Sequence, residues 1–213
     1  MIFPSLYGIS VEDTLKNLES VLDAGAKTIH YDVMDGSLVP NSFDGLGQLQ
    51  SSGAFLKKYG AVADVHLAVT FPQNYLSKIK ELRPSRASVH FESECDLKNM
   101  IDELKKEDIE VGLALTLKSH PSIEELQDIN ADFFHLVCNN EKNGVPQFQD
   151  SIFQKIADLS KLKKNITADC GIKRHHLLKL KECGIQNVVL GSALFAETEP
   201  GKTYANLSNL FSQ

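Results

Sequence analysis

Cysteine is scarce in this sequence, and no two cysteines form a closely spaced pair. The 213 residues contain four, far apart along the chain: Cys95, Cys138, Cys170 and Cys183. Thiolate zinc sites and the disulfide frameworks of small secreted domains both depend on close spacings such as Cys-x-x-Cys. Neither kind of site is indicated, and we expect the protein to work in a reducing, cytoplasmic compartment.

An excess of basic residues and long apolar runs are also missing. Lys and Arg total 22 against 28 Asp and Glu, which gives a net charge of -6, and no basic run exceeds residues 161–164. We therefore expect no nucleic-acid partner, since such a partner binds a basic surface. Residues Met1–Ser5 lack a basic segment followed by a long apolar stretch, so neither a signal peptide nor a membrane span is expected.

What the sequence does contain is a regular alternation of short apolar runs with amphipathic segments. Leu15, Leu18 and Leu22 recur at helical spacing, and Gly25 ends that helix just before the next strand. The predicted strands are Ile2–Pro4, Thr28–Val33, Ala61–Leu67, Arg86–His90, Val111–Leu115, Phe133–Cys138, Ile166–Asp169 and Val188–Gly191. The predicted helices are Val11–Leu22, Leu46–Tyr59, Pro72–Leu82, Leu97–Lys106, Pro121–Ile129, Ile152–Leu159, Lys173–Glu182 and Tyr204–Phe211.

Strict alternation of strands and helices predicts an α/β protein with a closed (β/α)8 TIM barrel. Each strand and helix unit takes about 25 residues, at the small end for this fold. No linker or low-complexity stretch divides the chain, so we expect one domain over residues 1–213. The main alternative is an open doubly wound sheet, but no Gly-x-Gly-x-x-Gly follows the first strand to favour it.

Polar side chains mark the ends of three predicted strands. His30 and Asp32 share one face of the second strand, His66 ends the third and Asp169 ends the seventh. Active sites of such barrels lie at the carboxyl ends of the strands, where these side chains would meet. Two imidazoles and two carboxylates suit zinc, iron, manganese or cobalt, each a Lewis acid for a carbonyl oxygen. The alternative is that each residue only caps its own strand.

Glycine and serine follow the last two predicted strands, at Gly171 and at Gly191 with Ser192. Barrel enzymes often hold a phosphate there on backbone N–H groups, which an anion can approach closely at glycine. The other interpretation is a turn in which glycine only relieves crowding. The position of these residues in the predicted barrel favours the phosphate site.

Several longer motifs resemble one known family. They are Phe3-Pro4-Ser5, His30-Tyr31-Asp32-Val33-Met34-Asp35-Gly36, Val39-Pro40-Asn41, Asp64-Val65-His66-Leu67, Asp169-Cys170-Gly171 and Gly191-Ser192-Ala193-Leu194-Phe195. These segments resemble the ribulose-phosphate 3-epimerases in order and register, over nearly the whole chain.

The resemblance implies an isomerase that inverts the carbon beside the ketone of a ketose phosphate, by two-base proton transfer through a metal-stabilised enediolate. Asp32 and Asp169 would exchange the proton on the two faces of that carbon. The implied ligands of the divalent metal are His30, Asp32, His66 and Asp169. The implied substrate and phosphate contacts are Ser5, Gly144, Gly171, Gly191 and Ser192. A homo-oligomer is also expected by similarity.

Other positions depart from the family pattern. Gly8 stands where the family usually has a serine, Ala68 where it has a methionine, and Cys170 where it has a glycine. Of the glycine-rich segment after the sixth strand, only Asn140 and Gly144 are kept. The metal and proton-transfer residues are thus retained while the pocket walls change. The substrate that we expect is D-ribulose 5-phosphate with D-xylulose 5-phosphate, or a related, longer ketose phosphate.

Two alternative functions stay open. A lyase or decarboxylase on the same barrel would usually carry Asp-x-Lys-x-x-Asp, whereas residues 32–35 read Asp-Val-Met-Asp. A catalytically silent relative that binds a sugar phosphate would fit the reduced glycine segment, but not the retention of Asp32 and Asp169. Of the other histidines, His90 either faces the pocket or is hydrogen-bonded at its strand end, and His135 lies outside the ligand pattern.

Overall fold

The computed structural model describes residues 1–142 and 145–213. The strands in these ranges are β1 (Ile2–Pro4), β2 (Thr28–Asp35), β3 (Ser42–Asp44), β4 (Val62–Ala68), β5 (Arg86–His90), β6 (Glu110–Leu115), β7 (Phe133–Val137), β8 (Asn139–Lys142), β9 (Val145–Phe148), β10 (Asn165–Asp169) and β11 (Asn187–Leu190). The α-helices are α1 (Val11–Asp23), α2 (Gly45–Tyr59), α3 (Leu76–Leu82), α4 (Leu97–Lys105), α5 (Ile123–Ile129), α6 (Ile152–Ser160), α7 (Leu177–Glu182), α8 (Ser192–Phe195) and α9 (Pro200–Ser212).

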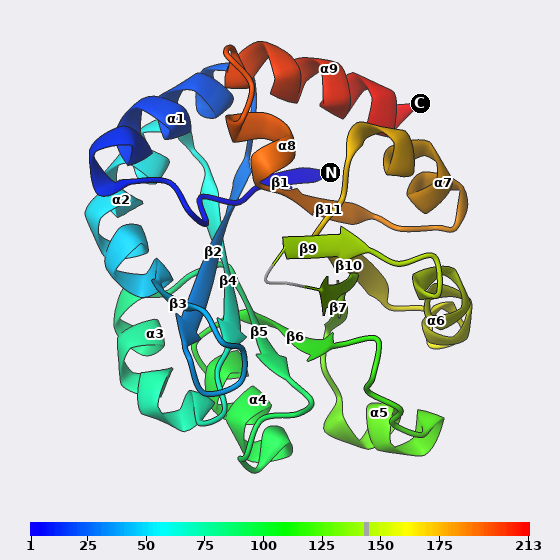
Figure 1. Ribbon diagram of the computed structural model, residues 1–213. Helices are drawn as coiled ribbons and strands as arrows, with labels where there is room; N and C mark the ends of the chain where they lie inside the picture. Colours follow the sequence, from blue (N-terminus) through cyan, green and yellow to red (C-terminus); the bar gives the residue numbers. More distant parts are fainter. Residues whose placement is uncertain (143–144) are drawn as a thin grey trace.

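Nine of these strands build one curled sheet surrounded by helices, and β8 and β9 pair in a separate two-stranded sheet (Figure 1). The nine strands of the curled sheet run in the order β1-β11-β10-β7-β6-β5-β4-β2-β3, and all but the short β3 lie parallel to their neighbours. A parallel bridge between Ser5 and His30 joins the end of β1 to β2 and closes the ring. The predicted TIM barrel is confirmed.

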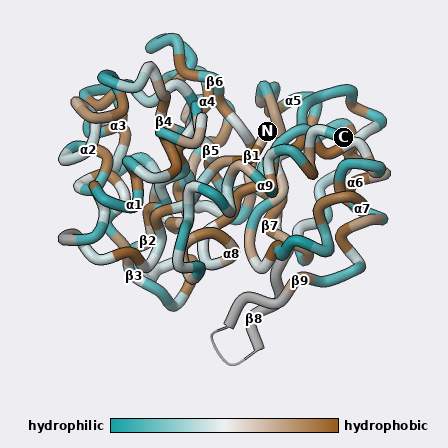
Figure 2. Tube along the Cα trace, turned by 90° about the horizontal axis from the view of Figure 1, so that it is seen from above, coloured by the Kyte–Doolittle hydropathy of each residue, from teal (hydrophilic) through white to brown (hydrophobic). Residues whose placement is uncertain are grey.

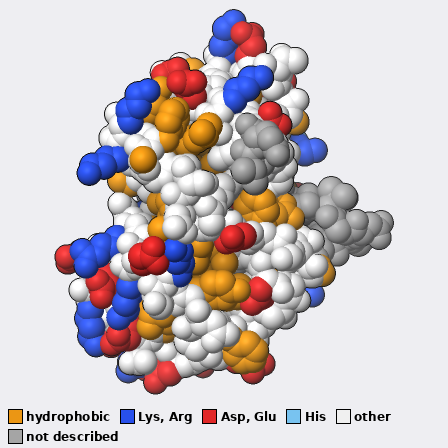
Figure 3. All heavy atoms as spheres, turned by 90° about the vertical axis from the view of Figure 1, so that its left-hand side faces the viewer, with side chains coloured by type: hydrophobic (Ala, Val, Ile, Leu, Met, Phe, Trp, Pro, Cys, Tyr) orange, Lys and Arg blue, Asp and Glu red, His pale blue; other side chains and the backbone are white. Residues whose placement is uncertain are grey.

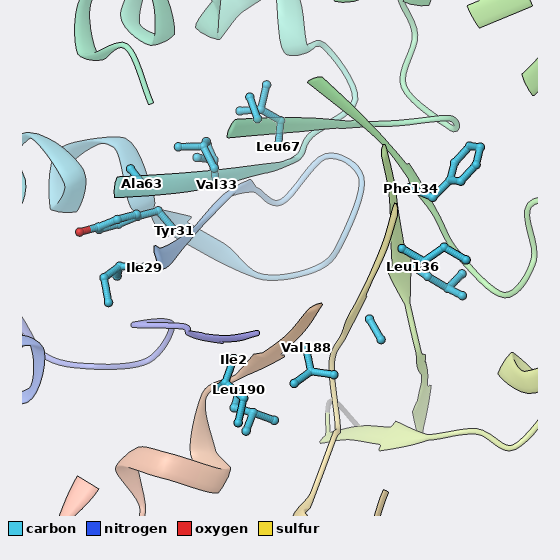
Figure 4. Packing of buried hydrophobic residues seen from close by; sticks show 14 of the residues in the cluster. Ile2, Ile29, Tyr31, Val33, Ala63, Leu67, Phe134, Leu136, Val188 and Leu190 are labelled. Carbon is cyan, nitrogen blue, oxygen red and sulfur yellow. The ribbon is translucent and has the colours of Figure 1, made fainter. Parts of the chain in front are cut away.

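Alternation along the barrel strands separates outer side chains, which pack under the helices, from inner ones. On β2, Ile29, Tyr31 and Val33 are buried on the side that faces the helices, and Figure 4 shows them pointing away from the barrel axis. The hydroxyl of Tyr31 lies 2.8 Å from Ser52 Oγ on α2, which ties the strand to its covering helix. The remaining side chains of β2, His30 and Asp32 among them, therefore point inward.

Helix boundaries follow local capping signals. Ser10 accepts a hydrogen bond from the Asp13 backbone at the start of α1, and Ser122 and Glu125 form a capping box at the start of α5. Gly60 ends α2 in the left-handed conformation that glycine adopts without strain. Figure 2 shows hydrophilic and hydrophobic residues alternating along the helices, as expected of helices packed on a barrel by one face.

The structure also contains elements that the sequence pattern did not reveal. The antiparallel β3, the hairpin of β8 with β9 and the one-turn α8 are too short to produce a periodic pattern. The last helix begins at Pro200 rather than at Tyr204, and Pro72–Tyr75 is a 3₁₀ turn rather than the start of an α-helix.

Charged side chains of both signs lie on the surface of the protein. On the face that Figure 3 shows, basic and acidic side chains are interspersed. Exposed ion pairs are numerous among the described residues, and one example is Lys98 with Asp128, at 2.7 Å. Within residues 1–142 and 145–213, none of the helices has the length and apolar character needed to traverse a bilayer.

Candidate active site

A cavity of about 880 Å³ opens at the carboxyl ends of the barrel strands. The structure places most of the predicted site residues on its walls: Ser5, Asp32, His66, Asp169, Gly171, Gly191 and Ser192. His30 lies beneath them and is fully buried. Gly144 lies outside the described residues. Residues from both ends of the chain thus converge on one cavity.

His30 is fixed by a hydrogen bond below the cavity. Its Nδ1 lies 2.7 Å from Asp64 Oδ2, and Asp64 in turn is 3.4 Å from the guanidinium of Arg86. Burial opposes ionisation of Asp64, but the hydrogen bond and charge of His30 bring its pKa below the ordinary value. Because Asp64 is ionised, the Nδ1 of His30 carries a proton and donates it. The Nε2 of His30 is therefore the atom directed at Asp32, 3.3 Å from Asp32 Oδ1.

His66 belongs to a chain of hydrogen bonds that ends at Glu92. His66 Nε2 lies 2.8 Å from His90 Nε2, and His90 Nδ1 lies 3.1 Å from Glu92 Oε2. Although burial opposes ionisation of Glu92, the hydrogen bonds from His90, Ser119 and Thr116 lower its pKa to about 2. An ionised Glu92 only accepts hydrogen bonds, so the Nδ1 of His90 donates to it.

The direction of these hydrogen bonds decides which nitrogen of His66 carries no proton. Because the Nδ1 of His90 donates to Glu92, its Nε2 is the acceptor in the contact with His66, and His66 donates from its own Nε2. Burial lowers the pKa of His66 to about 3, so its ring carries a single proton at neutral pH. The Nδ1 of His66 is thus a lone pair, and it faces Asp32 Oδ1 at 3.2 Å.

The two carboxylates of the site are held by different groups. Ser5 Oγ donates to Asp32 Oδ2 at 2.9 Å, while Asp32 Oδ1 faces His30 and His66. Asp169 accepts a hydrogen bond from the backbone N–H of Cys170, and its Oδ2 lies 3.1 Å from His135 Nε2. Burial raises the pKa of both acids, but the surrounding imidazoles outweigh it and leave both below the ordinary value. Both aspartates are therefore ionised at neutral pH.

The donor atoms fit a divalent cation. His30 Nε2 is 3.3 Å from Asp32 Oδ1 and 3.8 Å from Asp169 Oδ2, and His66 Nδ1 is 3.2 and 3.9 Å from the same two oxygens. Ligands on bonds of about 2.1 Å are separated by roughly 3.0 to 4.2 Å, depending on their angle. A lone pair of His66 that faces a carboxylate oxygen is unfavourable unless a positive charge lies between them.

The charge balance of the site also favours a bound cation. Although burial opposes protonation of His30, the carboxylates of Asp32 and Asp64 raise its pKa well above the ordinary value. In the protein without a cation, an additional proton on His30 supplies the positive charge that Asp32 and Asp169 require. The nitrogens of His30, His66 and His135 and an oxygen of Asp169 lie within 4.8 Å of one another, which is the spacing of a metal-binding group.

Part of the cavity wall beside Asp169 and Ser5 is formed by backbone. Cys170 and Gly171 both have φ of +69°, so two consecutive residues after β10 adopt the left-handed conformation. Gly191 follows β11 and lies beside Ser5, since a Cβ there would be in van der Waals contact with the Ser5 carbonyl oxygen, at 3.6 Å. This arrangement leaves the Gly171 and Gly191 backbones open to the cavity.

The sequence interpretation left His90 open and placed His135 outside the ligand pattern. His90 lines the cavity and holds His66, while His135 contacts Asp169 from β7. The available signal for His135 was its alternation with Phe134 and Leu136, which puts an imidazole on the inner face of a fully buried strand. Lys118 also lines the cavity.

Comparison with known proteins identifies the family of this chain. The profile of the ribulose-phosphate 3 epimerase family matches residues 1–195. The ribulose-phosphate 3-epimerase of Buchnera aphidicola subsp. Baizongia pistaciae is 31% identical over 186 residues, which cover 84% of this chain and 82% of that protein. The ribulose-phosphate 3-epimerase of Helicobacter pylori strain J99 is 26% identical over 216 residues, with 98% and 97% coverage.

Among solved structures, KGPDC from Streptococcus mutans superposes with a TM-score of 0.72 at 8% identity, covering 99% of this chain and 96% of that one. At this identity the likeness shows the barrel fold alone. The family match extends over all the motifs that carry the resemblance, from Phe3 to Phe195. This chain therefore belongs to the ribulose-phosphate 3-epimerase family, whose members are isomerases that act on carbohydrates.

Proposed function

We propose that this protein epimerises a ketose phosphate at the carbon next to its carbonyl group, with Asp32 and Asp169 as the acid/base pair. The observation that carries the proposal is the presence of two ionised carboxylates on separate strands, both directed at one cavity and both contacting the same imidazoles. Epimerisation removes a proton from one face of a carbon and returns one to the other face, so it needs two such groups.

The two aspartates would exchange roles with the direction of the reaction. In one direction the ionised Asp32 takes the proton at the third carbon, while Asp169, which takes up a proton as the substrate binds, delivers that proton to the opposite face. Asp32 then holds the proton and Asp169 is ionised, so in the other direction their roles are reversed. Ser5 holds the Asp32 carboxylate by one oxygen, and the Cys170 backbone holds Asp169. Both acids are thereby oriented before the substrate arrives.

The residues that would hold a divalent cation are His30 through Nε2, His66 through Nδ1, Asp32 and Asp169. Zinc, iron, manganese and cobalt all suit this set of nitrogen and oxygen donors. The cation, when bound, supplies positive charge for the negative charge that develops on the substrate oxygens as the proton leaves.

The phosphate would bind at Gly171, Gly191 and Ser192, with Gly144 as a further predicted contact. The backbone N–H groups and the Ser192 hydroxyl are suitable donors for an anion. The family points to D-ribulose 5-phosphate and D-xylulose 5-phosphate. Gly8 and Ala68 line the cavity where the family pattern has serine and methionine, and these smaller side chains support extending the substrate class to longer ketose phosphates. The single domain, the cytoplasmic location and the homo-oligomer stay predictions, as does the absence of a nucleic-acid partner.

A panel of ketose phosphates with five, six and seven carbons, assayed in deuterium oxide, tests the proposal. We expect deuterium at the third carbon together with formation of the epimer, at the highest kcat/KM for one chain length. A silent sugar-phosphate binder would incorporate no deuterium, and a lyase or decarboxylase would cleave a carbon–carbon bond. Exclusive use of D-ribulose 5-phosphate among the ketoses would overturn the extension to longer substrates but not the epimerase itself.

A further inference from the structure

We propose that His135 is a positioning residue for Asp169, with its proton on Nε2, and that it is not itself a ligand of the cation. This inference rests on the function proposed above. His135 lies within reach of the donor atoms of the candidate cation site, but its hydrogen-bond partners differ from those of His30 and His66.

His135 occupies the floor of the site. It comes from the middle of β7, is fully buried and packs face to face with two other imidazoles, with ring centroids 4.3 Å from His66 and 5.5 Å from His30. Its Nε2 lies 3.1 Å from Asp169 Oδ2. Distance alone is compatible with two roles, since two ligands of one cation and a donor with its acceptor are both about 3 Å apart.

The second nitrogen of each ring distinguishes these roles. A histidine that binds a cation through one nitrogen carries its proton on the other, and this N–H almost always donates to a partner. His30 has such a partner in Asp64, and His66 has one in His90. Among the described residues, the Nδ1 of His135 is buried and has no hydrogen-bond partner.

A proton on the Nδ1 of His135 would therefore be a buried donor without an acceptor, which costs about 1–3 kcal/mol. The same objection applies to the imidazolium, which also carries a proton on Nδ1. With the only proton on Nε2, the ring donates to Asp169 and leaves a lone pair unpaired, a less costly defect. A protonated Nε2 has no lone pair left for a cation.

Both carboxylate oxygens of Asp169 are therefore held by hydrogen bonds within the protein. Oδ1 accepts from the backbone of Cys170 and Oδ2 accepts from His135. Asp169 is the last residue of β10. Without the hydrogen bond from His135, its carboxylate would be free to rotate away from the substrate. The hydrogen bond therefore keeps one of the two acids in place on its face of the cavity.

Nitrogen NMR of the ¹⁵N-histidine-labelled protein tests the protonation state directly, in the metal-free and the Zn²⁺-loaded forms. The chain has seven histidines, and the signals of His135 are identified by their loss in His135→Gln. We expect a protonated Nε2 and an unprotonated, metal-free Nδ1 in both forms. A metal-shifted resonance on either nitrogen, or a proton on Nδ1, would overturn the inference. If Zn²⁺ does not bind at all, the cation site proposed above fails, and the metal-free spectrum still decides the tautomer.

Variants add a second readout. The amide nitrogen of Gln reaches about as far as Nε2, whereas Leu fills similar space without a donor. We expect His135→Leu to lower kcat about 10–100-fold with little change in KM, and His135→Gln to recover most of that loss. Zn²⁺ affinity in competition with a chelator should be nearly equal in wild type and His135→Gln. Equal losses of Zn²⁺ affinity in both variants would contradict a positioning role, and the exposed His175→Leu is the control.

Discussion

At the scale of single residues, the two acids carry the chemistry. We expect Asp32→Asn and Asp169→Asn each to lower epimerisation by about 10³-fold or more, because an amide neither takes nor returns the proton. The amide is nearly isosteric, so the circular dichroism spectrum should not change. Deuterium incorporation measured by NMR checks the result, and turnover within tenfold of wild type in either variant would remove that residue from the acid/base pair.

Cys170 is a residue whose backbone conformation does not suit its side chain. Its φ of +69° costs a residue with a Cβ about 1 kcal/mol, and Gly171 beside it has the same angle. We expect Cys170→Gly to raise the free energy of unfolding by about 0.5–1 kcal/mol, and Gly171→Ala to lower it by about 1 kcal/mol. Urea denaturation of the two variants should show these opposite signs. A loss of stability in Cys170→Gly would mean that its partly buried thiol contributes more than the strain removes.

At the scale of secondary-structure elements, one glycine decides how close α2 comes to β2. A Cβ at Gly45 would lie 2.1 Å from the Asp32 carbonyl oxygen. We therefore expect Gly45→Ala to lower the free energy of unfolding by about 3 kcal/mol and to reduce turnover, because the overlap displaces the strand segment that carries Asp32. Gly53 in the same helix has open space around it, so Gly53→Ala should instead stabilise by about 0.5–1 kcal/mol. Similar effects of the two substitutions, measured by urea denaturation, would contradict the close approach.

Glu92 links the end of β5 to the loop after β6. It accepts hydrogen bonds from Thr116 and Ser119 as well as from His90, and its pKa is lowered to about 2 from an ordinary 4.5. A lowered carboxyl pKa stabilises the fold above about pH 4.5, and this contribution is lost as the pH falls toward 2. The difference in the free energy of unfolding between wild type and Glu92→Gln should therefore shrink by up to about 3 kcal/mol as the pH falls over that range. A difference independent of pH would show that the carboxylate charge is not what stabilises this link.

At the scale of the whole molecule, the candidate cation site joins segments that are far apart in the chain. Its donors come from β2, β4 and β10, so they meet only in the folded protein. We expect Zn²⁺ at about 100 times its Kd to raise the free energy of unfolding by about 2.7 kcal/mol, and excess chelator to reverse the gain. Asp169→Asn should show a much smaller increase, whereas the exposed His175→Leu should respond as wild type does. An equal increase in Asp169→Asn would place the bound ion elsewhere.

The sequence by itself determined the alternation of strands and helices, the barrel and the family. Period-two and period-3.6 patterns report which face of each element is buried, and motifs such as residues 30–36 report residues whose chemistry is specific. The short β3, α8 and the hairpin after β7 carry too few residues for such a pattern, so only the coordinates revealed them.

Tertiary structure alone decided how the polar side chains pair. Sequence alternation put His30 and Asp32 on one face, but Asp64, His90 and His135 became neighbours of the site only when distant strands closed into a ring. The position of the proton on His66 also depends on tertiary contacts. The series of hydrogen bonds that ends at Glu92 determines which nitrogen of His66 is unprotonated. Hydrogen bonds between strands depend on the register and curvature of the barrel, which no local pattern of residues encodes.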